Sequence, residues 1–212
     1  MIRYILLVIL TAGLSAETIF AQGTEADSFL DQSLSVPVSS ARNTVNIEQV
    51  GTFNTATVTS SGNGSLLALS QRGDDQKAEV AFEGSDNLGE LLQQGQGNQA
   101  AISISGGTNV FSIEQTTTDL AGLRGNSISL SQLGLGNLAR QTQRGNENEM
   151  TLFQSGDANS ALMQQNGTSN VMQLEQLGNG NFADLSQTGV AAPLINVLQI
   201  GGMSVSISQT GN

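Results

Sequence analysis

Two neighbouring carboxylates, Asp74 and Asp75, are the most chemically suggestive pair in the 212-residue chain. Adjacent carboxylates could divide acid and base roles in a hydrolase or supply oxygen ligands to calcium. The sequence contains no His and no Cys, which excludes imidazole bases, thiolate nucleophiles, disulfides and the common zinc sites. Because no other segment repeats the pair, we interpret it as a solvated turn and predict no catalytic residue, metal site or cofactor.

Three glycine-rich segments imitate the nucleotide-binding fingerprint GxGxxA. They are GQGNQA from Gly95, GLGNLA from Gly134 and GNGNFA from Gly178. The fingerprint binds phosphate where a strand ends and a helix begins, whereas these segments share one position of a repeat and open no helix. The formal glycosylation sequons at Asn63 and Asn166 occupy similar positions, so we expect turns at all of them.

The charge balance argues against nucleic acid as a partner. The chain has 18 acidic and 7 basic residues, a formal net charge of −11. Phosphate backbones are bound by clustered Lys and Arg, which this chain lacks. With no catalytic group either, the sequence predicts neither nucleic-acid binding nor a small-molecule substrate.

Glutamine is the polar side chain that recurs most regularly. Stacked amides can hydrogen-bond to one another, which satisfies donors and acceptors that would cost about 1–3 kcal/mol each if buried unpaired. The pattern therefore predicts a structural polar ladder rather than a ligand site. Its predicted members are Gln49, Gln71, Gln93, Gln115, Gln132, Gln154, Gln176 and Gln199.

A repeat of about eleven residues positions these glutamines, from Asn43 to the carboxyl end. Each unit reads NxhxhxQxG, where h is apolar, and fourteen of fifteen units have Gly in the last slot, Thr117 being the exception. A fixed short period indicates a solenoid, whose units bury their apolar faces against one another. Gly, followed by the Asn of the next unit, favours positive φ and a tight turn. The predicted turn glycines are Gly51, Gly73, Gly95, Gly134, Gly156 and Gly178.

Apolar and polar residues alternate within each unit, which is the two-residue period of a β-strand. No charged residue occupies the Asn, apolar or Gln slots of any unit, so one face of each strand is predicted to be dry. The first apolar slot alternates between large residues such as Val45 and small ones such as Ala56, with Gly89 as an exception. The period therefore doubles to about 22 residues. The predicted fold is all-β: a two-sided β-solenoid of about eight strand-turn-strand rungs.

Four parts of the chain depart from the regular repeat. Residues 1–21 place Arg3 before a short apolar run and small residues, which is typical of a secretory signal peptide cleaved between positions 15 and 21. The alternative, a membrane anchor, needs roughly 20 apolar residues. Residues 22–42 are predicted to be a flexible leader. Residues 43–212 form the solenoid, interrupted at 116–125 by a loop or distorted rung that replaces one unit, and shifted by one residue before Ile195.

Together these features resemble the curlin family, the subunits of bacterial curli fibres. The segments NTVNIEQVGTFNTATV, NEMTLFQSGDANSALMQQNG and NVMQLEQLGNGNFADLSQTG carry the resemblance best. It implies export through an outer-membrane secretion channel and self-assembly with other curlin subunits into extracellular amyloid on the cell surface, for adhesion and biofilm matrix. The stretch GSLLALSQRGDDQKAEVAFEG is more similar to the minor, nucleator-type subunit. The array departs from the family in its length and in Ser60, Phe82 and Ile104, which replace glutamine.

The last unit places Val205, Ile207 and Gln209 in the inward slots and runs to the final residue without a capping unit. Soluble solenoids bury such edges under atypical caps, so this exposed terminal rung is predicted to template the next copy. One alternative is a soluble secreted solenoid that acts as a binding protein or adhesin, which would present a regular outer array of one residue type. The other is a polysaccharide-processing enzyme, which would need clustered charges and long inserted loops.

Overall fold

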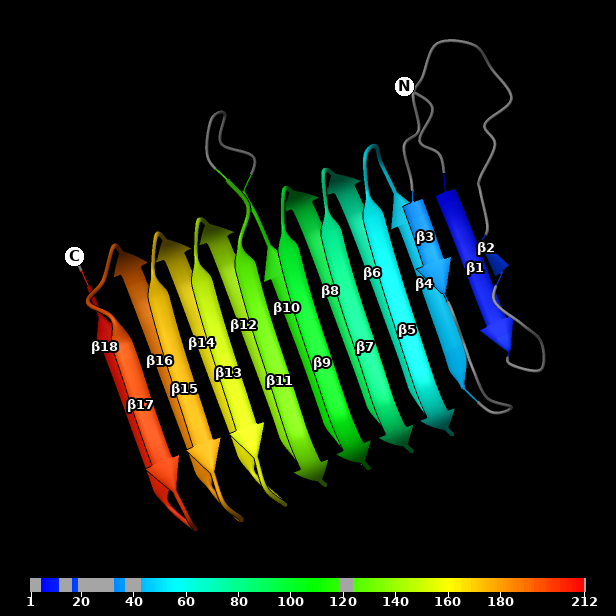
Figure 1. Cartoon of the computed structure of the whole chain (residues 1–212). Coiled ribbons are helices and arrows are strands. Elements are labelled where there is room, and N and C mark those ends of the chain that lie inside the picture. Colours follow the sequence, from blue (N-terminus) through cyan, green and yellow to red (C-terminus); the bar gives the residue numbers. More distant parts are fainter. Residues whose placement is uncertain (1–4, 12–16, 19–32, 37–42, 119–123, 212) are drawn as a thin grey trace.

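A computed structural model of the chain describes residues 5–11, 17–18, 33–36, 43–118 and 124–211. These residues form strands and turns and contain no helix, and therefore no helix that could cross a membrane. The strands lie in two sheets of nine, and successive repeats alternate between the sheets. Figure 1 shows the strands side by side along one axis, with β18 at one end.

The repeat strands pair in parallel within each sheet. Sheet A contains β4 (Thr44–Val50), β6 (Leu66–Asp74), β8 (Leu88–Gln96), β10 (Val110–Thr116), β12 (Leu138–Asn146), β14 (Ser160–Thr168), β16 (Phe182–Val190) and β18 (Ser204–Thr210). Sheet B contains β5 (Thr55–Asn63), β7 (Lys77–Ser85), β9 (Gln99–Gly107), β11 (Ser127–Leu135), β13 (Glu149–Ser155), β15 (Val171–Leu177) and β17 (Ile195–Ile200).

Side chains alternate between interior and solvent along the repeat strands. In β6 the inward Leu67, Leu69 and Gln71 are at most 2% exposed, while Ala68 and Arg72 face solvent. Within residues 43–118 and 124–211 no Asp, Glu, Lys or Arg is buried. Each large aliphatic side chain removed from water contributes about 1.5–3 kcal/mol. The predicted two-sided β-solenoid is confirmed, with about 22 residues per turn and seven complete turns plus one further strand, β18.

The turns use two positions with positive φ in most units. The six predicted turn glycines have φ between 85° and 121°. A Cβ on Gly51 would collide with the carbonyl oxygen of Gly73, because turns of neighbouring rungs stack in direct contact. The second positive φ belongs to the residue before Asn, for example Phe53 before Asn54. The prediction that Asn itself has a positive φ in the turn is wrong, because Asn already lies buried at the start of the strand.

The irregular segment at 116–125 lengthens one turn and replaces no unit, contrary to the prediction. Leu88 pairs with Val110, 22 residues on, but Val110 pairs with Leu138, 28 residues on. One connection still joins β10 to β11, so the chain passes from sheet A to sheet B as usual. The large residues of the first apolar slot therefore lie in sheet A up to Phe111 and in sheet B from Ile128 to Ile195, whereas Val205 in β18 lies in sheet A again.

Three short strands close the amino-terminal end of the stack. β1 (Ile5–Thr11) pairs antiparallel with β4. β3 (Ser33–Val36) pairs parallel with β5, and β2 (Glu17–Thr18) pairs antiparallel with β3. β1 and β2 belong to the predicted signal peptide, and β3 to the predicted leader, in which it is an ordered strand. The expected cleavage positions Ser15, Ala16 and Ala21 lie outside the described residues.

Candidate functional site: polar ladders and the end rung

The predicted ladder glutamines are all buried, but they form two columns. Gln49, Gln71, Gln93 and Gln115 lie in sheet A, whereas Gln132, Gln154, Gln176 and Gln199 lie in sheet B. Beyond the irregular segment at 116–125, called the insertion below, the sheet A column continues through Gln143, Gln165 and Gln187. Sequence analysis did not assign these three glutamines to it. Their place could have been found by counting connections, since each turn moves the chain to the opposite sheet.

Within each column the amides point in one direction. The Nε2 of each glutamine donates to the Oε1 of the next, at 2.6 Å from Gln49 to Gln71 and 2.8 Å from Gln71 to Gln93. The second Nε2 hydrogen of Gln71 reaches the carbonyl oxygen of Thr55 in the opposite sheet, 3.1 Å away. The acceptors therefore face the β4 end of the stack and the donors face the β18 end.

The ladders are interrupted at places that the neighbouring residues explain. Ile104 precedes Gln132 in its column and cannot donate, so Gln132 Oε1 is buried without a partner. Gln187 donates to the carbonyl oxygen of Pro193 at 2.7 Å instead of to Gln209, whose Oε1 is left without a partner. Gln49 Oε1 is also unpaired, because Gln49 lies in the first repeat rung.

A second ladder, of asparagines, was missed by sequence analysis, which assigned Asn to the turns. Asn109 Oδ1 accepts the backbone N–H of Asn137 at 3.0 Å, and Asn137 Oδ1 accepts that of Asn159 at 3.0 Å. The Nδ2 of Asn137 also donates to the carbonyl oxygen of Gly156 at 2.8 Å. Each such Asn thus joins its strand to the next rung and to a glycine turn. The absence of charged residues from the Asn slot of the repeat was the sequence feature that could have indicated this buried ladder.

The predicted end rung lies at the edge of sheet A. Along β18, Val205, Ile207 and Gln209 point inward but are half-buried, because no described strand covers them. The corresponding inward residues of β4 are fully buried, and they are Val45, Ile47 and Gln49. The two end strands of sheet A therefore present the same three residue types in the same order.

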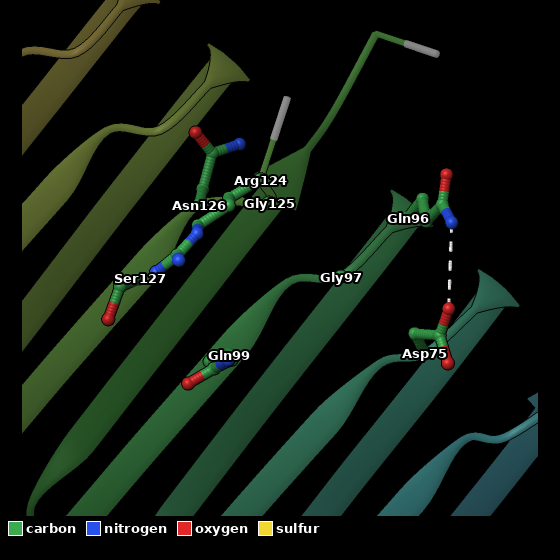
Figure 2. A pocket seen from close by; sticks show the side chains of 8 residues that line it. All are labelled: Asp75, Gln96, Gly97, Gln99, Arg124, Gly125, Asn126 and Ser127. Carbon is green, nitrogen blue, oxygen red and sulfur yellow. Dashed lines mark hydrogen bonds between the residues drawn. The ribbon is translucent and has the colours of Figure 1, made fainter. Parts of the chain in front are cut away.

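A hollow lies beside the irregular segment at residues 116–125. It measures about 480 Å³ and is lined by Asp75, Gln96, Gly97, Gln99, Arg124, Gly125, Asn126 and Ser127. Figure 2 shows Gln96 directed at Asp75, and the Nε2 to Oδ2 distance is 3.5 Å. Asp74 accepts from the backbone N–H of Thr52 at 2.8 Å. In the described part of the chain no three metal-ligating side chains cluster. Asp74 is the last residue of β6, and Asp75 lies in the bend that follows it.

Comparisons with known proteins identify the repeat. Four segments match the family model of the curlin associated repeat: residues 41–73, 84–116, 145–178 and 156–189. Together they span slightly more than half of the chain, on both sides of the insertion. No curated protein and no solved structure matches the chain significantly.

Proposed function

The chain belongs to the curlin family, and from that premise we propose that it is a secreted structural subunit or nucleator of an extracellular curli-type amyloid fibre. Because the chain belongs to this family, we expect it to self-assemble with other curlin subunits. Export of the chain through an outer-membrane channel, with residues 1–21 as signal peptide, belongs to the same proposal, as do adhesion and biofilm matrix. A fibre on the cell surface requires that export.

The observation that carries the proposal is the match between the two ends of sheet A. If β4 of a second copy follows β18 of the first, Val205 meets Val45, Ile207 meets Ile47 and Gln209 meets Gln49. Gln49 Oε1 is the acceptor without a donor, and Gln209 is the glutamine that would precede it. Stacking would then repeat between copies the parallel pairing found within one copy.

The amino-terminal strands fit the same arrangement. Sheet A has eight repeat strands and sheet B has seven. When two copies stack, sheet B therefore lacks one strand between β17 of the first copy and β5 of the second. β3 occupies that place, since it pairs in parallel with the outer edge of β5. β1 and β2 cover β4 and β3, and both belong to the predicted signal peptide. Its removal would expose both edges for the next copy.

A charge placed on the inward face of β18 tests the proposal. Ile207→Lys in protein lacking residues 1–21 should abolish or strongly delay fibre growth, because burying an unpaired ammonium between copies costs several kcal/mol. The single copy should still fold, since Ile207 is half-buried at an edge. Growth is followed by amyloid-dye fluorescence.

Ser206→Lys is the matched control, because Ser206 is the exposed neighbour on the same strand. It should leave the lag time nearly unchanged. Equal kinetics for the two variants would contradict stacking through β18, and a wild-type protein that never forms dye-positive fibres would contradict the fibre proposal altogether. Dye response after adding traces of this chain to another curlin subunit distinguishes a nucleator from a bulk subunit.

A further inference from the structure

An apolar column runs across the outer face of sheet A. Leu66, Leu88, Val110 and Leu138 follow one another in register on β6, β8, β10 and β12. The three leucines are 39–45% exposed. Contiguous exposed apolar side chains of this kind mark interaction surfaces. The column lies on the face of the sheet, so end-to-end stacking leaves it uncovered.

The neighbouring outward column is self-complementary about β10. In register it reads Ala68, Glu90, Ser112, Arg140 and Leu162. The residues at equal distance from Ser112 are opposite in charge, Glu90 and Arg140, or both apolar, Ala68 and Leu162. Within one copy Glu90 and Arg140 lie two strands apart, with Ser112 between them.

We propose that two copies pair face to face through sheet A, related by a two-fold axis that runs along β10. This rotation leaves each residue at the same position along the strand direction but reverses the order of the strands in the second copy. Val110 of one copy therefore faces Val110 of the other, and Leu88 faces Leu138. Glu90 then faces Arg140 twice, once on each side of the axis. Such a contact is isologous and closes after two copies.

Shape and charge support a second copy as the occupant. A shallow hollow of about 230 Å³ lies over β6, β8 and β10, lined in part by Leu66, Ala68 and Leu88. The pairing brings the exposed Leu162 of the other copy opposite the small Ala68. Glu114 would face its own equivalent, but each Glu114 is already ion-paired with Arg144 at 3.3 Å.

A single engineered cysteine tests the pairing in this cysteine-free chain. Val110→Cys should cross-link into dimers with a bismaleimide that spans about 10 Å, the face-to-face distance of packed sheets. Copies stacked end to end would place these cysteines roughly 38 Å apart, beyond the linker. Pairing therefore gives a signal independent of fibre stacking, and the two proposals can fail separately. Ser129→Cys, exposed on sheet B, is the control and should stay monomeric.

Charge exchange gives the second readout in the same cysteine background. Glu90→Arg or Arg140→Glu alone places like charges opposite each other and should lower the cross-linked yield by about five- to tenfold. The double variant restores opposite charges and should recover the yield. Val110→Cys that yields no more dimer than Ser129→Cys overturns the proposal, and so does a double variant that stays as low as the single ones.

Discussion

Gln141 is the one polar side chain in the aliphatic column of sheet A. It is fully buried, its Oε1 has no partner, and its Nε2 lies 4.0 Å from Met163 Sδ. Its neighbours in the column are Ile113 and Met163. Two residues on, Gln143 is equally buried but donates to Gln165 at 2.9 Å. The same residue type is therefore unfavourable at one position and stabilising at the other.

This contrast predicts opposite effects for one substitution. Gln141→Leu should raise the free energy of unfolding by about 1–3 kcal/mol, since it removes an unpaired buried amide. Gln143→Leu should lower it by a similar amount, because Gln165 Oε1 loses its donor. Guanidinium denaturation followed by circular dichroism measures both. Equal signs for the two variants would contradict the ladder as described.

Gly89, the small residue among the large ones of its column, makes room for an aromatic pair. Phe82 and Phe111 have ring centroids 5.9 Å apart, and a Cβ on Gly89 would overlap the Phe111 ring and lie 3.0 Å from Phe82 Cζ. The repeat revealed Gly89 as an exception, but its reason depends on Phe82 from the opposite sheet. One-dimensional periodicity does not show which side chains meet across the core.

Gly89→Ala should therefore destabilise the protein by about 1–3 kcal/mol, although alanine normally suits a strand better than glycine. Adding Phe111→Leu should recover part of that loss, because the smaller side chain frees the space. Thermal unfolding of the single and double variants gives the comparison. A more stable Gly89→Ala variant would show that the ring does not fill this space.

At the scale of elements, the periodicity of the sequence was sufficient to predict the strands, their inward faces and the 22-residue turn. It failed at the irregular segment 116–125. The large side chains of Phe111 and Ile128 suggest that both residues belong to one column, but the single connection between β10 and β11 places them in opposite sheets. Arg124 and Gly125 already occupy the last two turn positions before Asn126. The carbonyl oxygen of Arg124 accepts from Glu147, as Asp74 does from Gly97.

Deletion of residues 118–123 should accordingly leave the fold intact. It joins Thr117 to Arg124 and restores the eleven-residue spacing from Asn109 to Asn126. Shortening a loop by six residues changes the closure entropy by only about 0.5–1 kcal/mol. Deleting residues 127–132 instead removes most of β11 and should prevent folding. Loss of the circular-dichroism β signal in the 118–123 deletion would show that the insertion is needed by the stack.

At the scale of the whole molecule, the solenoid has a buried interior between its two sheets and an uncovered edge strand, β18, in sheet A. Glutamine and asparagine ladders satisfy most of the polar groups inside, and residues 43–212 contain 14 acidic and 5 basic residues, a formal net charge of −9. Stacked copies would bring this charge together along one axis, so their association must rely on the dry inner face of the end rungs. The matching residues of β4 and β18 supply that face.

Mass per length of fibres grown from the purified protein tests end-to-end stacking most directly. The full chain has a mass of 22.0 kDa, and without residues 1–21 each copy has a mass of about 20 kDa. If each such copy adds a complete solenoid about 38 Å long, one protofilament should weigh roughly 0.5 kDa per Å, or twice that when paired face to face. If instead each copy adds one layer about 4.8 Å high, as in a flat in-register amyloid, the value should be roughly 4 kDa per Å. The lower value, measured by scanning transmission electron microscopy, is the result expected here. The higher value would contradict a fibre built from stacked solenoids.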